Sequence, residues 1–338
     1  MKFALTYHIE GPRDRPSPEI YEEVARQVIL ADELGFDYAW FAEHHSHIHL
    51  GHLPCPLLLA LHLAGRTRRI HLGTAVICLN MHDPVDIAEQ VAVADHLTGG
   101  RISPGFGSGS TPEELALFGL PSVDADTRHA RFEESLRTIR QVWAGEGPAC
   151  GKGGGAQCGP PLPLGRPDLL RRSWLAANSV EAAVIAGKGG HNMMFSFLRT
   201  PEQYESLYSA YREAGGSGSV AANRPTYVGE SDEAAWAEAE PALRILWRRF
   251  VDEGKIPHDR PEPAVFNAGN APGQFLVGGP ETVVGFIREL HGRIPFDTFN
   301  IEPRWAGLAP ELVHGCIRRF AEQVAPEVER TTAGESLQ

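Results

Sequence analysis

The residues best suited to chemistry are histidines that follow a short apolar run, Tyr38–Ala42. Residues 43–49 read EHHSHIH, and His52 lies just beyond. Imidazole is the side chain best suited to proton transfer near neutral pH. The segment is consistent with a proton-transfer site centred on His44, with a His-rich loop without function, and with a metal site. Because zinc sites usually gather ligands from separated elements, and no matching ligand set occurs elsewhere, we expect no metal.

Two further segments could contact a ligand through their backbone. Residues 105–110 (GFGSGS) predict a tight turn with room for a cofactor, although they fit neither the dinucleotide fingerprint nor a P-loop. Residues 177–181 (ANSVE) lie where a strand is expected to turn into a helix. The free N–H groups there, together with the Ser179 hydroxyl, are typical of a phosphate site. The alternative is that Ser179 only caps the helix.

The elements that must position these segments alternate regularly. Eight short apolar or β-branched runs predict strands, at residues 2–7, 38–42, 70–77, 102–106, 173–177, 192–196, 224–228 and 297–302. Segments with helical spacing lie between them, and four begin at a cap followed by proline: Ser17, Asp83, Thr111 and Thr200. Strict alternation implies parallel strands, so we expect a single (β/α)8 barrel, with an open doubly wound sheet as the alternative.

Two stretches interrupt the alternation. Gly145–Gly165, after the fourth helix, and Gly254–Gly279, after the seventh strand, are expected to be irregular insertions because both are rich in glycine and proline. Each could serve as a lid over an active site or be a surface excursion without function. We expect the barrel to span residues 1–328 and to be followed by a flexible tail at 329–338.

Composition excludes several classes of protein. The 338 residues carry a formal net charge of −12, which argues against a nucleic-acid partner. The five cysteines are few and scattered, so we expect free thiols. The apolar start is too short for a signal peptide, and no apolar run approaches the roughly 20 residues of a membrane helix. A cytoplasmic protein without a membrane segment is therefore expected.

An ordered set of motifs resembles one known family. The set comprises WFAEHH at 40–45, LGTAV at 72–76, Pro84 with Ala88-Glu89, and DHLTGGR at 95–101. With these motifs the chain resembles the luciferase-like monooxygenases, which are flavin-dependent (β/α)8 barrels. The resemblance runs from Met1 to about Gly145 and resumes more loosely from Trp174 to Glu327.

The resemblance implies roles for individual residues. His44 corresponds to the catalytic histidine of the family. The implied cofactor contacts are Glu43, Ala75, Val76, Ser108, Asn178, Ser179 and Val180. Among them, 75–76 would pack against the isoalloxazine ring, where the family often has a non-proline cis peptide, and 178–180 would bind the phosphate. Luciferases have an arginine at the position of Ser108, so flavin binding is expected to be weaker here.

The resemblance also implies a reaction. Reduced FMN would react with O2 to give a C4a-peroxyflavin, which transfers one oxygen atom to a small organic substrate. Because the sequence has no nicotinamide fingerprint, a separate NAD(P)H:flavin reductase would supply FMNH2. The protein is also expected to be a homodimer. Substrate contacts are expected from strand ends, at His8, Leu79 and Glu302. The alternatives are an F420-dependent oxidoreductase of related fold and a flavin-binding protein without catalysis.

Overall fold

The structure is a computed structural model that describes residues 1–12, 14–45, 51–109, 111–121, 123–147, 149–150, 156–157, 159, 161–197, 199–254, 256–272 and 275–335. Within it the chain forms two compact units. Unit 1 contains Met1–Ala39, Phe195–Glu205 and Val220–Gln338, and unit 2 contains Trp40–Met194 and Ser206–Ser219. Along the chain, three elements begin in one unit and end in the other: β2 (Tyr38–Phe41), β10 (Asn192–Phe195) and α7 (Pro201–Glu213).

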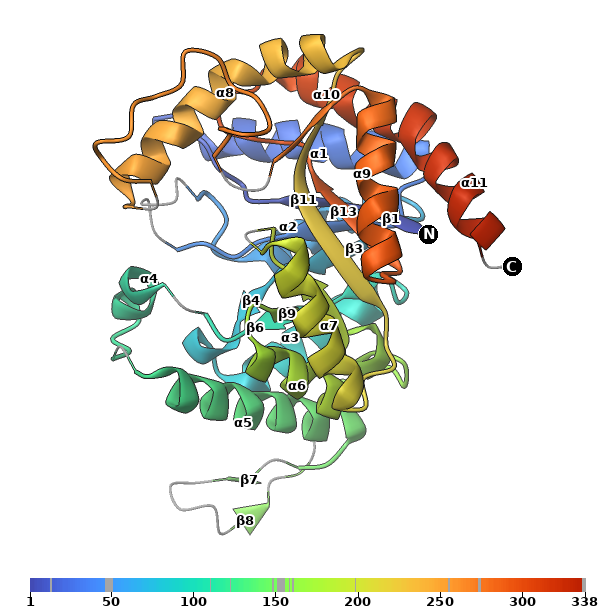
Figure 1. Ribbon diagram of the computed structural model, residues 1–338. Coiled ribbons are helices and arrows are strands. Elements are labelled where there is room, and N and C mark those ends of the chain that lie inside the picture. The colour runs from blue at the N-terminus through green and yellow to red at the C-terminus, as the bar shows by residue number, and fades with distance from the viewer. Residues whose placement is uncertain are drawn as a thin grey trace. The chain divides into compact units, whose positions relative to one another are not determined.

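Unit 1 is built on parallel strands in the order β12, β11, β13, β1. The strands are β1 (Lys2–Tyr7), β11 (Val220–Val228), β12 (Leu276–Gly278) and β13 (Thr298–Glu302). The helices are α1 (Ser17–Leu34), α8 (Asp232–Asp252), α9 (Pro280–Arg293), α10 (Pro310–Arg319), the π-helical turn η4 (Phe320–Val324) and α11 (Ala325–Glu335). Helices α8, α9 and α10, orange to red in Figure 1, pack against β11 and β12. All residues of β11 are buried, as expected of a parallel strand covered on both faces.

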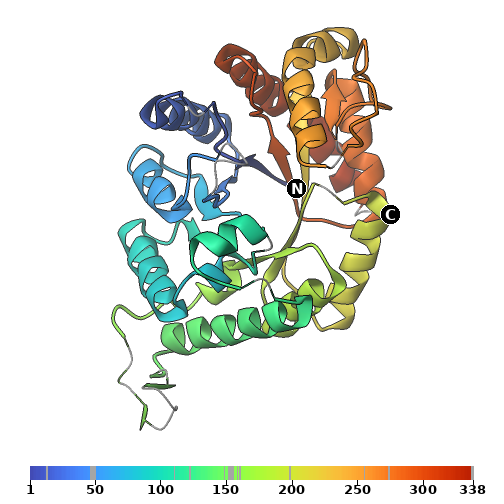
Figure 2. The ribbon, with the colours of Figure 1, turned by 90° about the vertical axis from the view of Figure 1, so that its left-hand side faces the viewer.

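Unit 2 contains two parallel ladders, β3–β5 and β4–β6–β9. The strands are β3 (His71–Thr74), β4 (Ile77–Cys78), β5 (Ile102–Ser103), β6 (Gly105–Gly107) and β9 (Trp174–Ala177), with an antiparallel pair of β7 (Ala149–Cys150) and β8 (Ala156–Gln157). The helices are α2 (Pro56–Ala64), η2 (Leu79–Met81), α3 (Pro84–Leu97), α4 (Pro112–Leu117), α5 (Ala125–Ala144), η3 (Leu170–Arg172) and α6 (Val180–Gly189). Helix α5, green in Figures 1 and 2, packs against α3.

All eight predicted strands are present, and two of them are divided. The run 70–77 forms β3 and β4 on either side of Ala75–Val76, and the run 102–106 forms β5 and β6 on either side of Pro104. A proline has no N–H to give to a ladder, which explains the second break. The predicted insertions also contain strands: β7 and β8 lie within 145–165, and β12 lies within 254–279. Residues 329–335, predicted to be a flexible tail, instead continue helix α11.

The helices begin at the predicted prolines or one residue before them, but only some of the predicted capping residues cap them. The Asp83 carboxylate caps α3, and the Thr200 and Gln203 side chains form a reciprocal capping box. Ser17 is the first residue of α1 rather than its cap, and the Thr111 side chain makes no cap hydrogen bond. No helix among the described residues is long and apolar enough to cross a membrane.

The DHLTGGR motif serves the packing of unit 2. Asp95 is completely buried, and the Arg172 guanidinium donates to both of its carboxylate oxygens at 2.9 Å. Arg101 donates to the backbone carbonyls of Ala64 and Ile70. Because a buried charge is tolerated only when it is paired, the Asp95–Arg172 pair fixes the end of α3 against the segment that leads into β9.

We therefore expect Arg172→Ala to lower the free energy of unfolding by up to about 3–5 kcal/mol, because it leaves the buried Asp95 carboxylate with only the Arg166 guanidinium, 3.7 Å away. Urea denaturation measures the change. The matched control is Arg137→Ala, which removes an arginine that is 60% exposed and paired with Glu134. Such a surface pair contributes about 0–1 kcal/mol, so equal losses in the two variants would contradict the assigned role of Arg172.

Candidate active site

The residues predicted to contact a cofactor come together at the carboxyl ends of strands in unit 2. Because β4, β6 and β9 are parallel neighbours, the residues that follow them leave the same edge of the sheet. Ser108 follows β6, and Asn178 and Ser179 follow β9. Cys78, the last residue of β4, donates its backbone N–H to the Glu43 carboxylate at 3.2 Å. One edge of unit 2 therefore carries both the histidine segment and the predicted phosphate turn.

The backbone between β3 and β4 has the geometry that the resemblance implied, because the Ala75–Val76 peptide is cis. The Ala75 N–H donates to the Phe41 carbonyl at 2.8 Å. In the neighbouring strand β6, a Cβ on Gly107 would lie 2.5 Å from the Val76 side chain, so only glycine fits there. Ala75 and Val76 themselves remain partly exposed. A planar group could therefore pack on them.

The glycine segment 105–110 differs from its prediction. Residues 105–107 form β6 rather than a tight turn. Gly105 is needed because a Cβ there would lie 2.0 Å from the Thr74 carbonyl oxygen. Only Gly109 has a left-handed φ, of +66°, and Ser110 lies outside the described residues. The glycines of the strand thus permit close packing of neighbouring backbone, and the turn itself is confined to the residues after 107.

Glu43 is the centre of a hydrogen-bonded cluster. Its side chain is 1% exposed, and its Oε1 lies 2.7 Å from His45 Nε2 and 2.8 Å from His82 Nε2. The hydrogen bond to Glu43 raises the pKa of His82 and outweighs the opposite effect of burial. The Glu43 oxygens are therefore already engaged by groups of this chain. A direct contact of Glu43 with flavin stays a prediction.

The same three side chains form the one group among the described residues that could hold a metal ion. Their ligand atoms all lie within 4.8 Å of one another. His82 supplies the separate element that the sequence did not reveal, while His47 and His49 lie outside the described residues. Hydrogen bonding accounts for the cluster without an ion, because the carboxylate accepts from both rings. That the loop functions without metal stays a prediction.

His44 and His45 have different partners. Nδ1 of His44 lies 3.4 Å from Glu114 Oε1, and the His44 side chain is 23% exposed. The His45 backbone donates to the same oxygen at 2.9 Å, while its ring packs edge-on against Phe118. Burial alone would raise the pKa of Glu114, but hydrogen bonds from His44, the His45 backbone and Thr111 lower it to about 2. An ionised Glu114 therefore orients the His44 ring.

The predicted phosphate turn lies at the start of α6. The Ser179 oxygen accepts from the Ala182 N–H at 3.3 Å, so Ser179 does cap this helix. Asn178 and Val180 are exposed beside it. The backbone N–H of Glu181 and the Ser179 hydroxyl both bind the Glu181 carboxylate and lower its pKa. This carboxylate occupies the donors that a phosphate would use, so an anion would have to replace it.

Two of the three predicted substrate contacts are neighbours in unit 1. His8 follows β1, and its Nε2 lies 3.6 Å from Oε1 of Glu302, the last residue of β13. Burial lowers the pKa of His8, but the Glu302 charge, a hydrogen bond to Glu302 and the Glu10 charge together outweigh burial, so the pKa is raised overall. Leu79, the third predicted contact, is completely buried in η2 of unit 2. It offers no surface to a substrate.

A second pair of polar side chains resembles a nucleophile and base but lacks access. The Ser173 hydroxyl lies 2.6 Å from His191 Nδ1. Burial and, to a smaller degree, Arg140 lower the pKa of His191 to about 4. Both residues are at most 3% exposed and precede β9 and β10, at the amino ends of the strands. Groups at the amino ends of the strands of a barrel are expected to stabilise its packing rather than to take part in catalysis.

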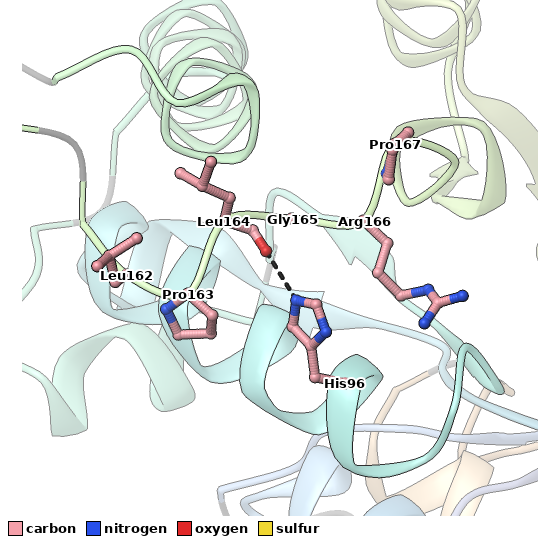
Figure 3. A pocket seen from close by; sticks show the side chains of 7 residues that line it. All are labelled: His96, Leu162, Pro163, Leu164, Gly165, Arg166 and Pro167. Atoms are coloured by element: carbon pink, nitrogen blue, oxygen red, sulfur yellow. Dashed lines mark hydrogen bonds between the residues drawn. The ribbon is translucent and has the colours of Figure 1, made fainter.

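One hollow of unit 2 lies away from the histidine cluster. It has a volume of about 700 Å³ and is lined by His96 and residues 162–167 (Figure 3). The His96 ring bonds the Leu164 carbonyl at 2.9 Å. His96 lies in the last turn of α3, whereas His82 precedes its first turn. Helix α3 has 14 residues and is therefore about 20 Å long, so this hollow is not part of the candidate site.

The described thiols are free, as predicted for Cys55, Cys78 and Cys316. Burial raises the pKa of Cys78, and the charges of Glu43 and Glu114 add to this effect. Burial likewise raises the pKa of Cys316 to about 12. The side chains of the other two cysteines lie outside the described part of the chain.

Sequence reasoning missed two members of the site. His82 was not singled out, although it follows the end of β4 by only four residues and precedes the cap of α3. Glu114 stands three residues after Thr111, which is the spacing of a capping-box partner. In the structure its carboxylate accepts from the Thr111 side chain and also from the His45 backbone, and it orients His44.

Glu114 should contribute stability in a defined pH window. Because its pKa is lowered from 4.5 to about 2, the contribution is present above about pH 4.5 and is lost as the pH falls toward 2. We expect Glu114→Gln to reduce the urea midpoint near pH 6 and to have progressively less effect at lower pH. Glu113→Gln, at the exposed neighbouring position, is the control and should show no such dependence. An effect of Glu114→Gln that is constant from pH 7 to pH 3 would contradict the assignment.

Comparison with known proteins supplies relatives of both cofactor types. The oxygenase component of the flavin-dependent trigonelline monooxygenase of Acinetobacter baylyi is 26% identical over 260 residues, which cover 74% of this chain and 71% of the relative. An F420-dependent glucose-6-phosphate dehydrogenase of Amycolatopsis mediterranei is 28% identical over 210 residues, which cover 60% of this chain and 59% of the relative.

Solved structures give the fold. The monooxygenase RslO1 from Streptomyces bottropensis has a TM-score of 0.80 at 25% identity and covers 96% of this chain and 99% of its own. The oxygenating constituent of 3,6-diketocamphane monooxygenase from Pseudomonas putida, solved with FMN, has a TM-score of 0.78 at 20% identity. Its match covers 97% of this chain and 99% of the neighbour's chain. The predicted (β/α)8 barrel is thereby confirmed. Residues 1–294 match the model of one family, and the chain belongs to it: it is a luciferase-like monooxygenase family member.

Proposed function

We propose that this protein is the oxygenase component of a two-component flavin-dependent monooxygenase. It would take reduced FMN from a separate NAD(P)H:flavin reductase and use O2 to transfer one oxygen atom to a small organic substrate. The observation that carries the proposal is a set of groups at one edge of unit 2. The set comprises His44, which Glu114 orients, the cis peptide Ala75–Val76, Ser108 and Ser179. The trigonelline relative, named as a flavin-dependent oxygenase component, supports it.

The residues present fit FMN. The partly exposed side chains of Ala75 and Val76 suit a planar ring, and the donors at Ser108, Ser179 and the first turn of α6 suit a phosphate. Bound FMN supplies the reaction with O2. The protein's share is binding, orientation and proton transfer. His44 would hold or move a proton at its imidazole, with the ionised Glu114 keeping the ring in place.

An F420-dependent oxidoreductase is the second candidate, and the relative from Amycolatopsis favours it. The Glu43-His44-His45 sequence favours FMN. Spectroscopy separates the possibilities: oxygen consumption with FMNH2 supports the oxygenase, a change of F420 absorbance with substrate supports the alternative, and tight flavin binding with neither supports a non-catalytic protein. A homodimer and a cytoplasmic location belong to the same proposal.

We expect His44→Ala to reduce oxygen transfer by about 10²–10⁴-fold, because a positioned proton-transfer group is lost. Flavin binding and stability should change little, since the His44 side chain is 23% exposed. The measurement mixes FMNH2-loaded protein rapidly with O2 and substrate, and follows flavin oxidation and product yield.

The neighbouring variant His45→Ala is the matched control. Its ring faces Glu43 rather than Glu114, so it should reduce product yield less and stability more. If His45→Ala alone abolished transfer, the catalytic role would belong to His45. If both variants kept normal yield, the proposed mechanism would be wrong.

We expect Ser108→Arg to tighten FMN binding by about 1–2 kcal/mol, because a guanidinium can form a charge-assisted contact to phosphate that a hydroxyl cannot. Fluorescence titration of oxidised FMN measures the change.

Ser108→Leu controls for the added bulk and should not tighten binding. Glu181→Gln should act in the same direction as Ser108→Arg, because it removes a negative charge from the donors of the same turn. Unchanged affinity in both Ser108→Arg and Glu181→Gln would refute the placement of the phosphate.

A further inference from the structure

Another hollow of unit 2 lies between helices α5 and α6, which pack against each other (Figure 1). Its volume is about 320 Å³. The charged residues that α5 contributes stand at positions i, i+4 and i+7, so they share one face of that helix. We call this hollow the basic groove, and its lining includes Glu133, Arg137, Arg140, Lys188, Gly189 and His191.

The charge of the basic groove is opposite to that of the chain. The protein has a formal net charge of −12, yet three cationic side chains line the groove against one carboxylate, Glu133. Arg137 pairs with Glu134 at the surface. Neither Arg140 nor Lys188 has an ion-pair partner among the residues that the structure describes. A concave cluster of this kind raises the local concentration of anions.

Gly189 leaves room for a ligand beside two nitrogen atoms. A Cβ at this position would lie 2.9 Å from His191 Nε2 and 3.6 Å from Arg140 Nη2. Both nitrogens therefore border the space that a side chain at position 189 would fill. The Arg140 guanidinium also donates to the Gly189 carbonyl. This bond holds Arg140 in place and satisfies a carbonyl at the end of α6 that would otherwise repel an anion.

The hydrogen bonds of Ser173 determine which nitrogen of His191 carries a proton. The Ser173 hydroxyl contacts both the Leu170 carbonyl and His191 Nδ1. Because a carbonyl can only accept, the single hydroxyl proton goes to Leu170, and Nδ1–H donates to Ser173 Oγ. Burial and, to a smaller degree, Arg140 lower the pKa of His191 to about 4, so the ring is neutral at pH 7. Nε2 therefore offers a lone pair at the groove.

We propose that the basic groove binds a phosphate group that carries a proton. The anionic oxygens would accept from Arg140 and Lys188, and the P–OH group would donate to His191 Nε2. Cations combined with a hydrogen-bond acceptor suit an anion that can also donate. Sulfate and carboxylates, which carry no proton at neutral pH, suit this combination less well.

The basic groove is separate from the candidate active site. Ser173 and His191 precede β9 and β10, whereas the predicted FMN phosphate turn follows β9 at Asn178 and Ser179. The four residues of β9 place about 13 Å between the two ends. Helix α6 joins the two regions, since it begins after Ser179 and ends at Gly189. The proposal does not depend on the proposed function.

Calorimetric titration of the full chain with inorganic phosphate at pH 6 tests the binding. Sulfate is the matched probe of similar size, and phosphate should bind about tenfold more tightly, because sulfate would place a negative oxygen against the His191 lone pair. Methyl phosphate, which still carries a proton in part at this pH, distinguishes the two sources of the ligand. Comparable binding of methyl phosphate would assign the groove to phosphate esters, and much weaker binding would assign it to free phosphate.

Variants locate the bound phosphate. Lys188→Gln and Arg140→Gln should each weaken phosphate binding by about tenfold, the ratio expected when a hydrogen bond to a charged group is lost. Lys188→Gln is the cleaner variant, because Arg140 also bonds the backbone of α6. Arg131→Gln removes an exposed arginine of α5 outside the groove and should keep the affinity. The proposal is overturned if both groove variants bind phosphate normally, or if phosphate is not preferred over sulfate.

The pH dependence of sulfate binding gives a second measurement. Protonation of His191 turns Nε2 into a donor, so sulfate should bind more tightly as the pH falls from 7 to 5, by up to about tenfold per pH unit. The charged groups around His191 are Arg140 from α5 and Lys188 from α6, and Glu133 is the one carboxylate of the lining. Glu133→Gln is therefore the control and should keep this pH dependence. Sulfate binding that is constant with pH, or that becomes constant in Glu133→Gln, would contradict the role of His191 and overturn the proposal.

Discussion

The candidate site depends on one buried carboxylate. Glu43 is removed from water, and a charge in that position requires compensating partners. It obtains them from three segments that are separate in the sequence: the residues after β2, the end of β4 and the turn before α3. The same requirement fixes His45 toward Glu43. With its neighbour held in this way, His44 is left to face Glu114.

The second constraint is the close approach of parallel strands in unit 2. β6 passes so near residues 74–76 that two of its positions have no room for a side chain. The strand edge formed in this way consists largely of backbone and small residues. Larger functional groups therefore sit on the segments that follow the strands, which is where a (β/α)8 barrel generally carries its chemistry. Variation of those segments can change the reaction without disturbing the ladder.

Periodicity and turn residues were sufficient to locate the eight strands, because alternation and boundaries are local properties of a sequence. The short strands within the glycine-rich stretches were not found, since β12 has only three residues and depends on pairing with β11. Position at a strand end predicted His8, Glu302 and Leu79 as substrate contacts. His8 and Glu302 are neighbours in the structure, whereas η2 turns the Leu79 side chain into the core.

The role of Glu114 shows a different limit. Its spacing from Thr111 fits a local motif, and sequence reasoning favours local partners over distant ones. The carboxylate does bind Thr111, but it also accepts from residues about 70 positions away in the chain. The position of such a contact is set by tertiary packing. The resemblance to a family implied a role for His44 but gave no indication of the acidic residue that orients it.

The protonated state of the Cys78 and Cys316 thiols has a consequence for the proposed function. Reduced flavin that meets O2 without substrate would release hydrogen peroxide, and the thiolate is the form of cysteine that peroxide oxidises. Burial raises the pKa of Cys316 to about 12, and burial with two nearby carboxylates raises that of Cys78. Both therefore remain thiols at neutral pH. Under the proposed function, this would limit oxidation of the two thiols by peroxide, including at the cysteine whose backbone binds Glu43.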